Sequence, residues 1–189
     1  MNTRPTAPPE RRRVRLIRSA VGSAVFFAAA PSVVAGLLPW SLTRWRATDN
    51  IAGGMMTRAV GAALTACGLV VLTSAFVRFV REGLGTPAPI APTEHLVIGG
   101  LYRHVRNPMY LAVVAIIVGQ GLVLGRAVLL TYAGGAAAAM ASFAHFVEEP
   151  ALARQFGVDF DEYRRAVRPW RPRLRGWEPP RGRSGLARD

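Results

Sequence analysis

Long apolar runs separated by short polar stretches make up most of this chain. Four such runs lie at about residues 19–38, 57–80, 108–124 and 127–147. A helix needs roughly 20 apolar residues to cross a bilayer, so each run is long enough or nearly so. We therefore expect an all-α fold, a polytopic membrane-embedded bundle of about four transmembrane helices.

Small residues predict how these helices meet. The second run carries a face of small side chains, along which a neighbouring helix can approach closely. Its members are Gly61, Ala62, Ala66 and Gly68. Gly125 and Arg126 leave room only for a tight turn, so the third and fourth runs should form a helical hairpin. The only cysteine, Cys67, cannot form an intramolecular disulfide, and we expect it to be a small buried apolar residue.

The polar segments outside the hairpin carry weaker signals. The first run is expected to end near Leu38, because Pro39, Trp40 and Trp45 suit a membrane interface. Residues 41–56 would then form a short loop. Three prolines forbid a regular helix in the long segment 82–100.

The chain after Glu148 changes to an amphipathic pattern. Apolar residues recur there at steps of three and four, with a break expected at Gly157. They are Leu152, Phe156, Phe160, Tyr163 and Val167. This pattern predicts cytosolic helices that lie on or just below the membrane surface.

Charge argues for a membrane protein and against a nucleic-acid binder. Arginine supplies all 24 basic residues, and the formal net charge is +13. A nucleic-acid-binding domain would carry such charge on a polar surface, whereas these arginines flank apolar runs. The distribution predicts that both termini and the stretch 101–110 are cytosolic, because cytosolic loops are rich in arginine.

Two polar clusters flank the predicted hairpin. The first contains Tyr102, Arg103, His104, Arg106, Asn107 and Tyr110, and the second contains His145, Glu148 and Glu149. A hairpin brings the start of its first helix beside the end of its second, so the clusters should meet. Pro108 suits the first position of the third helix, since its missing N–H would be unpaired there anyway.

These clusters allow a purely structural and a functional interpretation. Charged groups at membrane depth are costly unless they are paired or functional. Arg106 with Glu148 or Glu149 is therefore either a structural ion pair or part of a site for a charged small molecule. His145 shares a helix face with Glu149, four residues later. Gln120, in the middle of the third run, is expected to hydrogen-bond another helix.

Three segments together resemble a known enzyme family. They are GTPAP at 85–89, LYRHVRNPMY at 101–110 and EEPALARQFGVDFDEYRRAV at 148–167. In this order they are similar to the isoprenylcysteine carboxyl methyltransferase family, including its bacterial members, within a wider group that contains phospholipid methyltransferases. The resemblance covers roughly residues 83–174. It implies a bacterial inner-membrane enzyme that holds S-adenosylmethionine between membrane and cytosol, while a lipidic substrate enters from the bilayer.

The resemblance also implies roles for individual residues. The catalytic set is Arg106, Glu148 and Glu149. The resemblance implies a cofactor-binding role for Tyr102, Arg106, Asn107, Pro108, Tyr110, Glu148 and Glu149, with Phe160 and Tyr163 bordering the pocket. The predicted cofactor-binding set also includes Tyr163 and, from the two polar clusters, Arg103, His104 and His145. Asn107 stands where the eukaryotic pattern has histidine, and Phe160 replaces a tyrosine. A family arginine near the end of the match corresponds only loosely to Arg168, Arg171 or Arg173.

The residue types agree with this cofactor. Arg106 and the N–H groups after Pro108 would hold its carboxylate, and Glu148 or Glu149 its ammonium or ribose hydroxyls. Tyrosine or histidine would contact the adenine. A carboxylate acceptor, as in isoprenylcysteine, needs no general base, whereas a lipid amine does, and Glu148, Glu149, His104 or His145 could supply it. The sequence has no glycine-rich loop after a strand, so a soluble, Rossmann-type methyltransferase is not expected.

The implied organisation has four parts: a disordered basic arm at 1–18, two transmembrane helices within 19–82, a cofactor-binding core at 83–175 and a disordered tail at 176–189. Two other functions remain open at this point. One is a membrane reductase of the sterol type with a nicotinamide cofactor, and the other is a non-catalytic membrane protein. No metal site is expected, and the sequence does not specify an oligomeric state.

Overall fold

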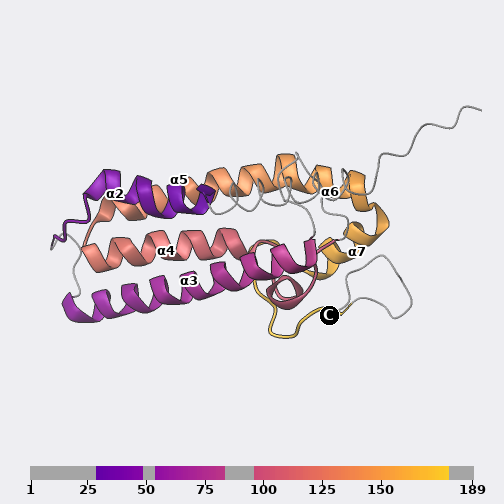
Figure 1. The fold of residues 1–189 in the computed structure, drawn as a ribbon, viewed down its shortest axis with the longest axis horizontal. Coiled ribbons are helices and arrows are strands. Elements are labelled where there is room, and N and C mark those ends of the chain that lie inside the picture. The colour runs from indigo at the N-terminus through magenta and orange to yellow at the C-terminus, as the bar shows by residue number, and fades with distance from the viewer. Residues whose placement is uncertain (1–28, 49–53, 84–95, 179–189) are drawn as a thin grey trace, which may run out of the picture.

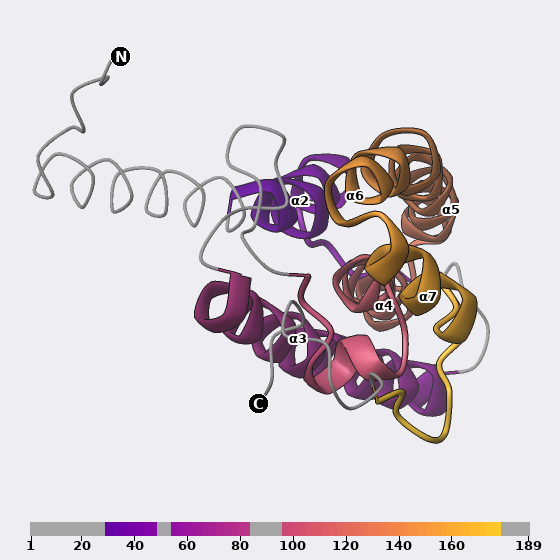
Figure 2. The same cartoon turned by 90° about the vertical axis from the view of Figure 1, so that its right-hand side faces the viewer.

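The computed structural model describes residues 29–48, 54–83 and 96–178, and all its regular elements within these ranges are helices. In chain order they are η1 (Val33–Leu37), α2 (Leu38–Thr43), α3 (Gly54–Gly83), η2 (Gly100–Arg103), α4 (Pro108–Leu124), α5 (Ala127–Phe143), η3 (Ala144–Glu148), α6 (Glu149–Phe156) and α7 (Val158–Ala166). Figure 1 shows α2, α3, α4 and α5 side by side, with α6 and α7 at one end. Seen from that end, α4 lies in the middle of the bundle (Figure 2).

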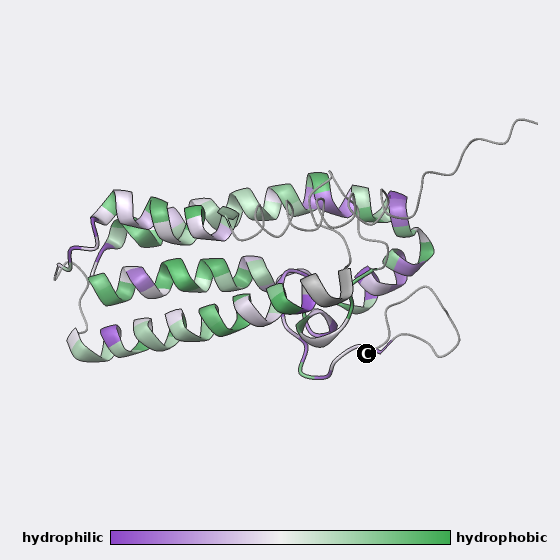
Figure 3. Cartoon of the chain, viewed as in Figure 1, coloured by the Kyte–Doolittle hydropathy of each residue, from purple (hydrophilic) through white to green (hydrophobic). Residues whose placement is uncertain are grey.

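Two helical stretches have the length and composition to cross a membrane. They are Gly54–Arg78 and Ala127–Phe156, whereas Ala29–Thr43 and Pro108–Leu124 are apolar but shorter. Only 17% of the apolar window of each long helix is buried inside the molecule. Most apolar side chains of these two helices therefore lie at the molecular surface, as in a protein surrounded by lipid. Figure 3 shows that hydrophobic residues are frequent along the helices of the bundle. Within the described residues the all-helical prediction is confirmed, and two of the four expected spans are long enough to cross. Residues 19–28 of the first expected span lie outside the described part.

Helices α3 and α4 approach each other closely through glycine. A Cβ atom built on Gly61 would lie 2.7 Å from the carbonyl oxygen of Gly119, and one on Gly68 would lie 2.9 Å from that of Ala112. No side chain fits at either position. The predicted small-residue face is thus confirmed for these two glycines.

Three other expectations for α3 are wrong. Ala62 and Ala66 are exposed and lie outside the contact with α4. Cys67 is exposed as well, although its apolar surroundings in the sequence predicted burial. A helix at the surface of a membrane bundle is apolar on its outer face too, so apolar neighbours alone do not predict burial.

The α4–α5 hairpin begins and turns where the sequence predicts. Pro108 occupies the first turn of α4, and Gly125 ends the helix with φ 65°. The N–H of Arg126 donates to the carbonyl of Gly121, 2.9 Å away, so the turn is tight. The fourth run does not stop at Val147. It continues through the π turn η3 into α6, and the helical path ends only at Gly157, with φ 51°.

The first run also extends further than predicted, because α2 continues to Thr43 instead of ending near Leu38. The loop expected at 41–56 is correspondingly shorter. The π turn η1 leaves the carbonyls of Val34 and Ala35 to accept hydrogen bonds from Tyr132 of α5 and Gln120 of α4, at 2.8 and 2.7 Å. The interhelical hydrogen bond expected of Gln120 is confirmed. Residues 1–28, 84–95 and 179–189 lie outside the described part, and with them the basic arm, the GTPAP motif and most of the tail.

The amphipathic C-terminal pattern builds one small core. Phe160, Tyr163 and Val167 are buried with Leu96 and Ile98. Leu152 and Phe156 of α6 lie against this cluster, so all five periodic positions are accounted for. The core places α7 beside the segment that leads into α4.

Candidate functional site

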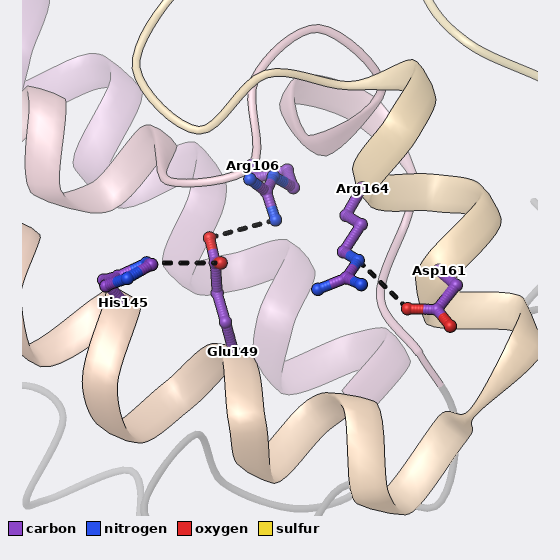
Figure 4. Close-up of polar contacts among 5 residues, drawn as sticks. All are labelled: Arg106, His145, Glu149, Asp161 and Arg164. Atoms are coloured by element: carbon purple, nitrogen blue, oxygen red, sulfur yellow. Dashed lines mark ion pairs between the residues drawn. The ribbon is translucent and has the colours of Figure 1, made fainter.

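The two polar clusters meet at the end of the hairpin. Nη1 of Arg106, just before α4, lies 3.0 Å from Oε1 of Glu149, the first residue of α6 (Figure 4). The two side chains are only 11% and 22% exposed. The hairpin therefore brings together opposite charges from the start of one helix and the continuation of the other.

A second contact lies beside this ion pair. The hydroxyl of Tyr110 donates to Oε1 of Glu148 at 2.5 Å. Adjacent residues point about 100° apart on a regular helix, yet both carboxylates find partners near the start of α4. Glu148 closes the π turn η3 and Glu149 opens α6. Single π turns of this kind occur often at functional sites.

His145 lies near the carboxylate of Glu149, on its solvent-exposed side. Its Nδ1 lies 3.9 Å from Oε2 of Glu149, and its side chain is 70% exposed. One carboxylate group thus stands between a largely buried guanidinium and an exposed imidazole (Figure 4).

Residues 168–177, called here the C-terminal strap, hold the segment before α4 in place. The N–H groups of Arg106 and Asn107 donate to the carbonyls of Arg168 and Pro169, at 3.0 and 3.3 Å. Further along, the N–H groups of Arg173 and Trp177 donate to the carbonyls of His104 and Arg103, each at 2.9 Å. These four bonds fix the backbone that presents Arg106.

Aromatic rings of the strap extend this support to the side chains. Trp170 stacks on Tyr110, with ring centroids 6.2 Å apart and an interplanar angle of 22°. Trp177 lies against Tyr163, at 5.6 Å. Neither tryptophan is among the site residues that the sequence predicts. The only signal for them was their place just after the motif residues, in a stretch without helical or strand periodicity.

Tyr163 and His104 are engaged in structural contacts. The hydroxyl of Tyr163 donates to the carbonyl of Tyr102 at 2.7 Å. Burial raises the pKa of this hydroxyl, an effect that nearby Arg106 partly opposes, so Tyr163 stays a donor at neutral pH. Nδ1 of His104 lies 2.8 Å from the carbonyl of Arg173, which makes it a donor to the strap.

The remaining predicted residues occupy the edges of the site. Asn107 is the N-cap of α4, without a side-chain capping bond, and Pro108 is buried in the first turn. Arg168 and Arg171 are exposed, whereas Arg173 donates to the carbonyl of Ala166 at 2.7 Å. Among these three arginines, Arg173 is thus the partly buried one.

Comparison with known proteins identifies the family. The family model for phospholipid methyltransferases matches residues 56–159, more than half of the chain. The chain belongs to the phospholipid methyltransferase family. The match runs from α3 into α7 and contains Arg106, Glu148 and Glu149. A search of curated proteins and a search of solved structures each returned no match.

Membership of the phospholipid methyltransferase family identifies the chain as a methyltransferase and supports its association with a membrane. It confirms the family group indicated by the sequence motifs. It also weighs against the nicotinamide-dependent reductase and against a purely structural membrane protein, the two alternatives that the sequence left open.

Proposed function

We propose that this protein is an integral membrane methyltransferase that uses S-adenosylmethionine and acts on a lipidic or amphiphilic acceptor. Its family and its outward-facing apolar helices support a membrane methyltransferase with lipid-type substrates. The observation that carries the proposal is the pairing of Arg106 with Glu149 beside that of Tyr110 with Glu148.

The donors and acceptors at this position fit the cofactor. S-adenosylmethionine carries a carboxylate, an ammonium, ribose hydroxyls and a flat adenine. Nε of Arg106 is buried and has no hydrogen-bond partner among the described residues, so the guanidinium retains a donor for a carboxylate. Glu148 and Glu149 offer acceptors for an ammonium or for hydroxyls.

In this proposal the chain supplies binding and positioning. Arg106 and the start of α4 hold the cofactor carboxylate, and the two glutamates hold its ammonium or ribose. The aromatic side chains of Tyr102 and Tyr110 would border the adenine, whereas Tyr163 is buried in the C-terminal core and supports the segment before α4 through its bond to Tyr102. When bound, the cofactor supplies an electrophilic methyl group on its sulfonium. Correct placement of the two reactants can provide most of the acceleration of such an in-line displacement.

We further propose that the site and both termini face the cytosol of a bacterial inner membrane, as the arginine distribution suggests. The acceptor would be either the carboxylate of an isoprenylcysteine-like lipid or a lipid amine. Residues 83–175 would form the cofactor-binding core, and 19–82 two transmembrane helices.

Calorimetry with purified protein tests the cofactor directly. S-adenosylhomocysteine should bind and NADPH should not. The Arg106–Glu149 pair suits the carboxylate and ammonium of the former, and the chain belongs to a methyltransferase family. Binding of NADPH alone would overturn the proposal. Incubating membranes with S-adenosylmethionine labelled in its methyl group, followed by mass spectrometry of the lipids, would then identify the acceptor.

A further inference from the structure

The end of the bundle away from the candidate site is held in a defined shape by hydrogen bonds. Figure 1 shows that α2 ends and α3 begins there, opposite to α6 and α7. After α2, Arg44 and Trp45 both adopt the left-handed conformation, with φ 50° and 51°, which ends the helix. The N–H of Thr48 then donates to the carbonyl of Leu124, 2.8 Å away, and its hydroxyl donates to that of Gly125, 3.0 Å away. The chain after α2 is thus fixed against the turn between α4 and α5.

Large apolar side chains are exposed at this end. They are Trp40, Leu42 and Trp45, at the end of the apolar stretch Ala29–Thr43 and just after it. Tryptophan is enriched where a membrane meets water, because its ring suits the acyl chains and its N–H suits the headgroups. These side chains therefore place the end of α2 at the depth of the lipid headgroups.

Arginines accompany the tryptophans, and acidic residues are scarce. Arg44 and Arg46 are exposed, and Nε of Arg126, in the turn between α4 and α5, donates to the carbonyl of Arg46 at 2.9 Å. Within residues 29–81 and 96–147 of the sequence, Asp49 is the only acidic residue. This end of the bundle therefore carries a net positive charge that few protein carboxylates can balance.

Arg44 is held in a way that suits an anion. Its guanidinium carbon lies 4.4 Å from the centroid of the Trp40 ring. A guanidinium that lies over an aromatic ring uses its face for that contact, so the N–H groups along its edge can still bind a phosphate. The indole thus orients a planar set of donors at the membrane surface.

The usual topology rule does not explain these arginines. Arginine accumulates in cytosolic loops, and in the proposed orientation this end of the bundle faces away from the cytosol. A charged side chain beside an apolar surface is costly unless it is paired or functional. The anions that surround a membrane protein at this depth are the phosphates of lipid headgroups.

We propose that this end of the molecule docks on anionic phospholipids of the leaflet that it faces. The docking surface, called here the Arg–Trp cluster, consists of Trp40, Arg44, Trp45, Arg46 and Arg126. The guanidinium groups of Arg44 and Arg46 bind the headgroup phosphate, and the two indoles contact the glycerol and the upper acyl chain. The exposed apolar rings beside the arginines favour a lipid over a soluble phosphate ester. The inference does not depend on the proposed methyl transfer.

The test measures which lipid gathers at the cluster. Ala47 is exposed and follows Arg46, so a bimane fluorophore on Ala47→Cys, in full-length protein with Cys67→Ser, reports on this position. The protein is placed in nanodiscs of phosphatidylcholine that contain phosphatidylglycerol, and either lipid carries a nitroxide near the top of its acyl chain. At equal mole fractions, labelled phosphatidylglycerol should be enriched at the fluorophore at least about fivefold over labelled phosphatidylcholine, as its quenching measures, since one arginine near an anionic surface contributes about that factor.

Two variants and a charge-matched control locate the effect. Arg44→Asn combined with Arg46→Gln should lower the enrichment to less than about twofold. Asparagine is chosen because it tolerates the left-handed conformation. Arg46→Gln alone changes an exposed side chain and should lower the enrichment at least about twofold, which decides the matter if the double variant is unstable. Arg154→Gln combined with Arg165→Gln removes two exposed charges at the opposite end and should keep the full enrichment.

Three results would overturn the proposal. The first is equal quenching by the two lipids in the protein with both arginines, and the second is an enrichment that survives Arg46→Gln and the double variant unchanged. The third is displacement of the labelled lipid by soluble glycerol phosphate as readily as by unlabelled phosphatidylglycerol, which would make the cluster a site for a free phosphate ester. S-adenosylhomocysteine should bind the double variant and the control equally well, so a failure of this inference leaves the methyltransferase function standing.

Discussion

Glu149 is the residue at which structural and functional roles can be separated. Its carboxylate pairs with Arg106, so replacing it by glutamine keeps an oxygen for the guanidinium but removes the charge. We expect Glu149→Gln to raise the dissociation constant of S-adenosylhomocysteine at least about tenfold, since a charge-assisted hydrogen bond contributes roughly 1.5–3 kcal/mol. The melting temperature should fall by only about 3 °C, because the retained hydrogen bond limits the loss to about 1 kcal/mol.

The control for this residue is an ion pair of similar geometry outside the site. Asp161 and Arg164 of α7 also lie 3.0 Å apart, and both side chains are considerably more exposed than those of Arg106 and Glu149 (Figure 4). Asp161→Asn should change neither cofactor binding nor the melting temperature appreciably. If Glu149→Gln lowered stability as strongly as it lowered affinity, the Arg106–Glu149 pair would be structural.

At the scale of elements, the C-terminal strap should act on the site through Trp170. The indole stacks on Tyr110, which in turn donates to Glu148. Trp170→Ala removes the indole that stacks on Tyr110 and lets the tyrosine ring move, so binding of S-adenosylhomocysteine should weaken about fivefold to tenfold. Trp170→Phe keeps a ring and should recover most of the affinity. Calorimetry on the two variants measures this difference.

The strap itself offers a matched position for comparison. Leu174 is fully exposed, so Leu174→Ala changes the same element without touching the site. Its affinity should equal that of the wild type. Equal losses in Trp170→Ala and Leu174→Ala would mean that the strap does not position Tyr110.

The elements differ in how far the sequence predicts them. The bounds of α4 follow from Pro108 and Gly125, and the meeting of Arg106 with Glu149 follows from the hairpin. The position of the C-terminal strap does not follow from the sequence, because its backbone hydrogen bonds join two irregular segments that have no periodicity. The sequence gives no signal for the π turn η3 either. This turn allows the helix to continue past Val147, where a helix end was expected.

At the scale of the whole molecule, the glycine contact between α3 and α4 should determine stability more than function. A Cβ atom on Gly119 would lie 2.6 Å from the carbonyl oxygen of Gly61 and would also clash with Oγ1 of Thr65. Gly119→Ala should therefore cost about 1–3 kcal/mol and lower the melting temperature by several degrees. Gly135→Ala is the control, since a Cβ atom there meets nothing within 4 Å. It should be neutral or slightly stabilising, and equal effects would contradict a close helix contact.

The two ends of the bundle should lie on opposite sides of the membrane. Thr48 donates its N–H to the carbonyl of Leu124, at the end of α4, whereas Arg173 donates to His104, just before α4 begins. The 17 residues of α4 separate these ends by roughly 25 Å, at 1.5 Å per residue. Exposed Ala47 and Leu174 thus mark the two ends, and each can be changed to cysteine after Cys67→Ser removes the native thiol.

Labelling with a thiol reagent that cannot cross membranes then shows which end of the bundle faces the outside of the cell. In intact cells it should label Ala47→Cys and spare Leu174→Cys, because the strap and the site are expected on the arginine-rich cytosolic side. Breaking the cells should make Leu174→Cys reactive. The reverse pattern would place the Arg106–Glu149 pair on the outer side, beyond the reach of a cytosolic methyl donor, and would contradict the proposed location of the activity. Labelling of both positions in intact cells would mean that α4 does not separate two compartments.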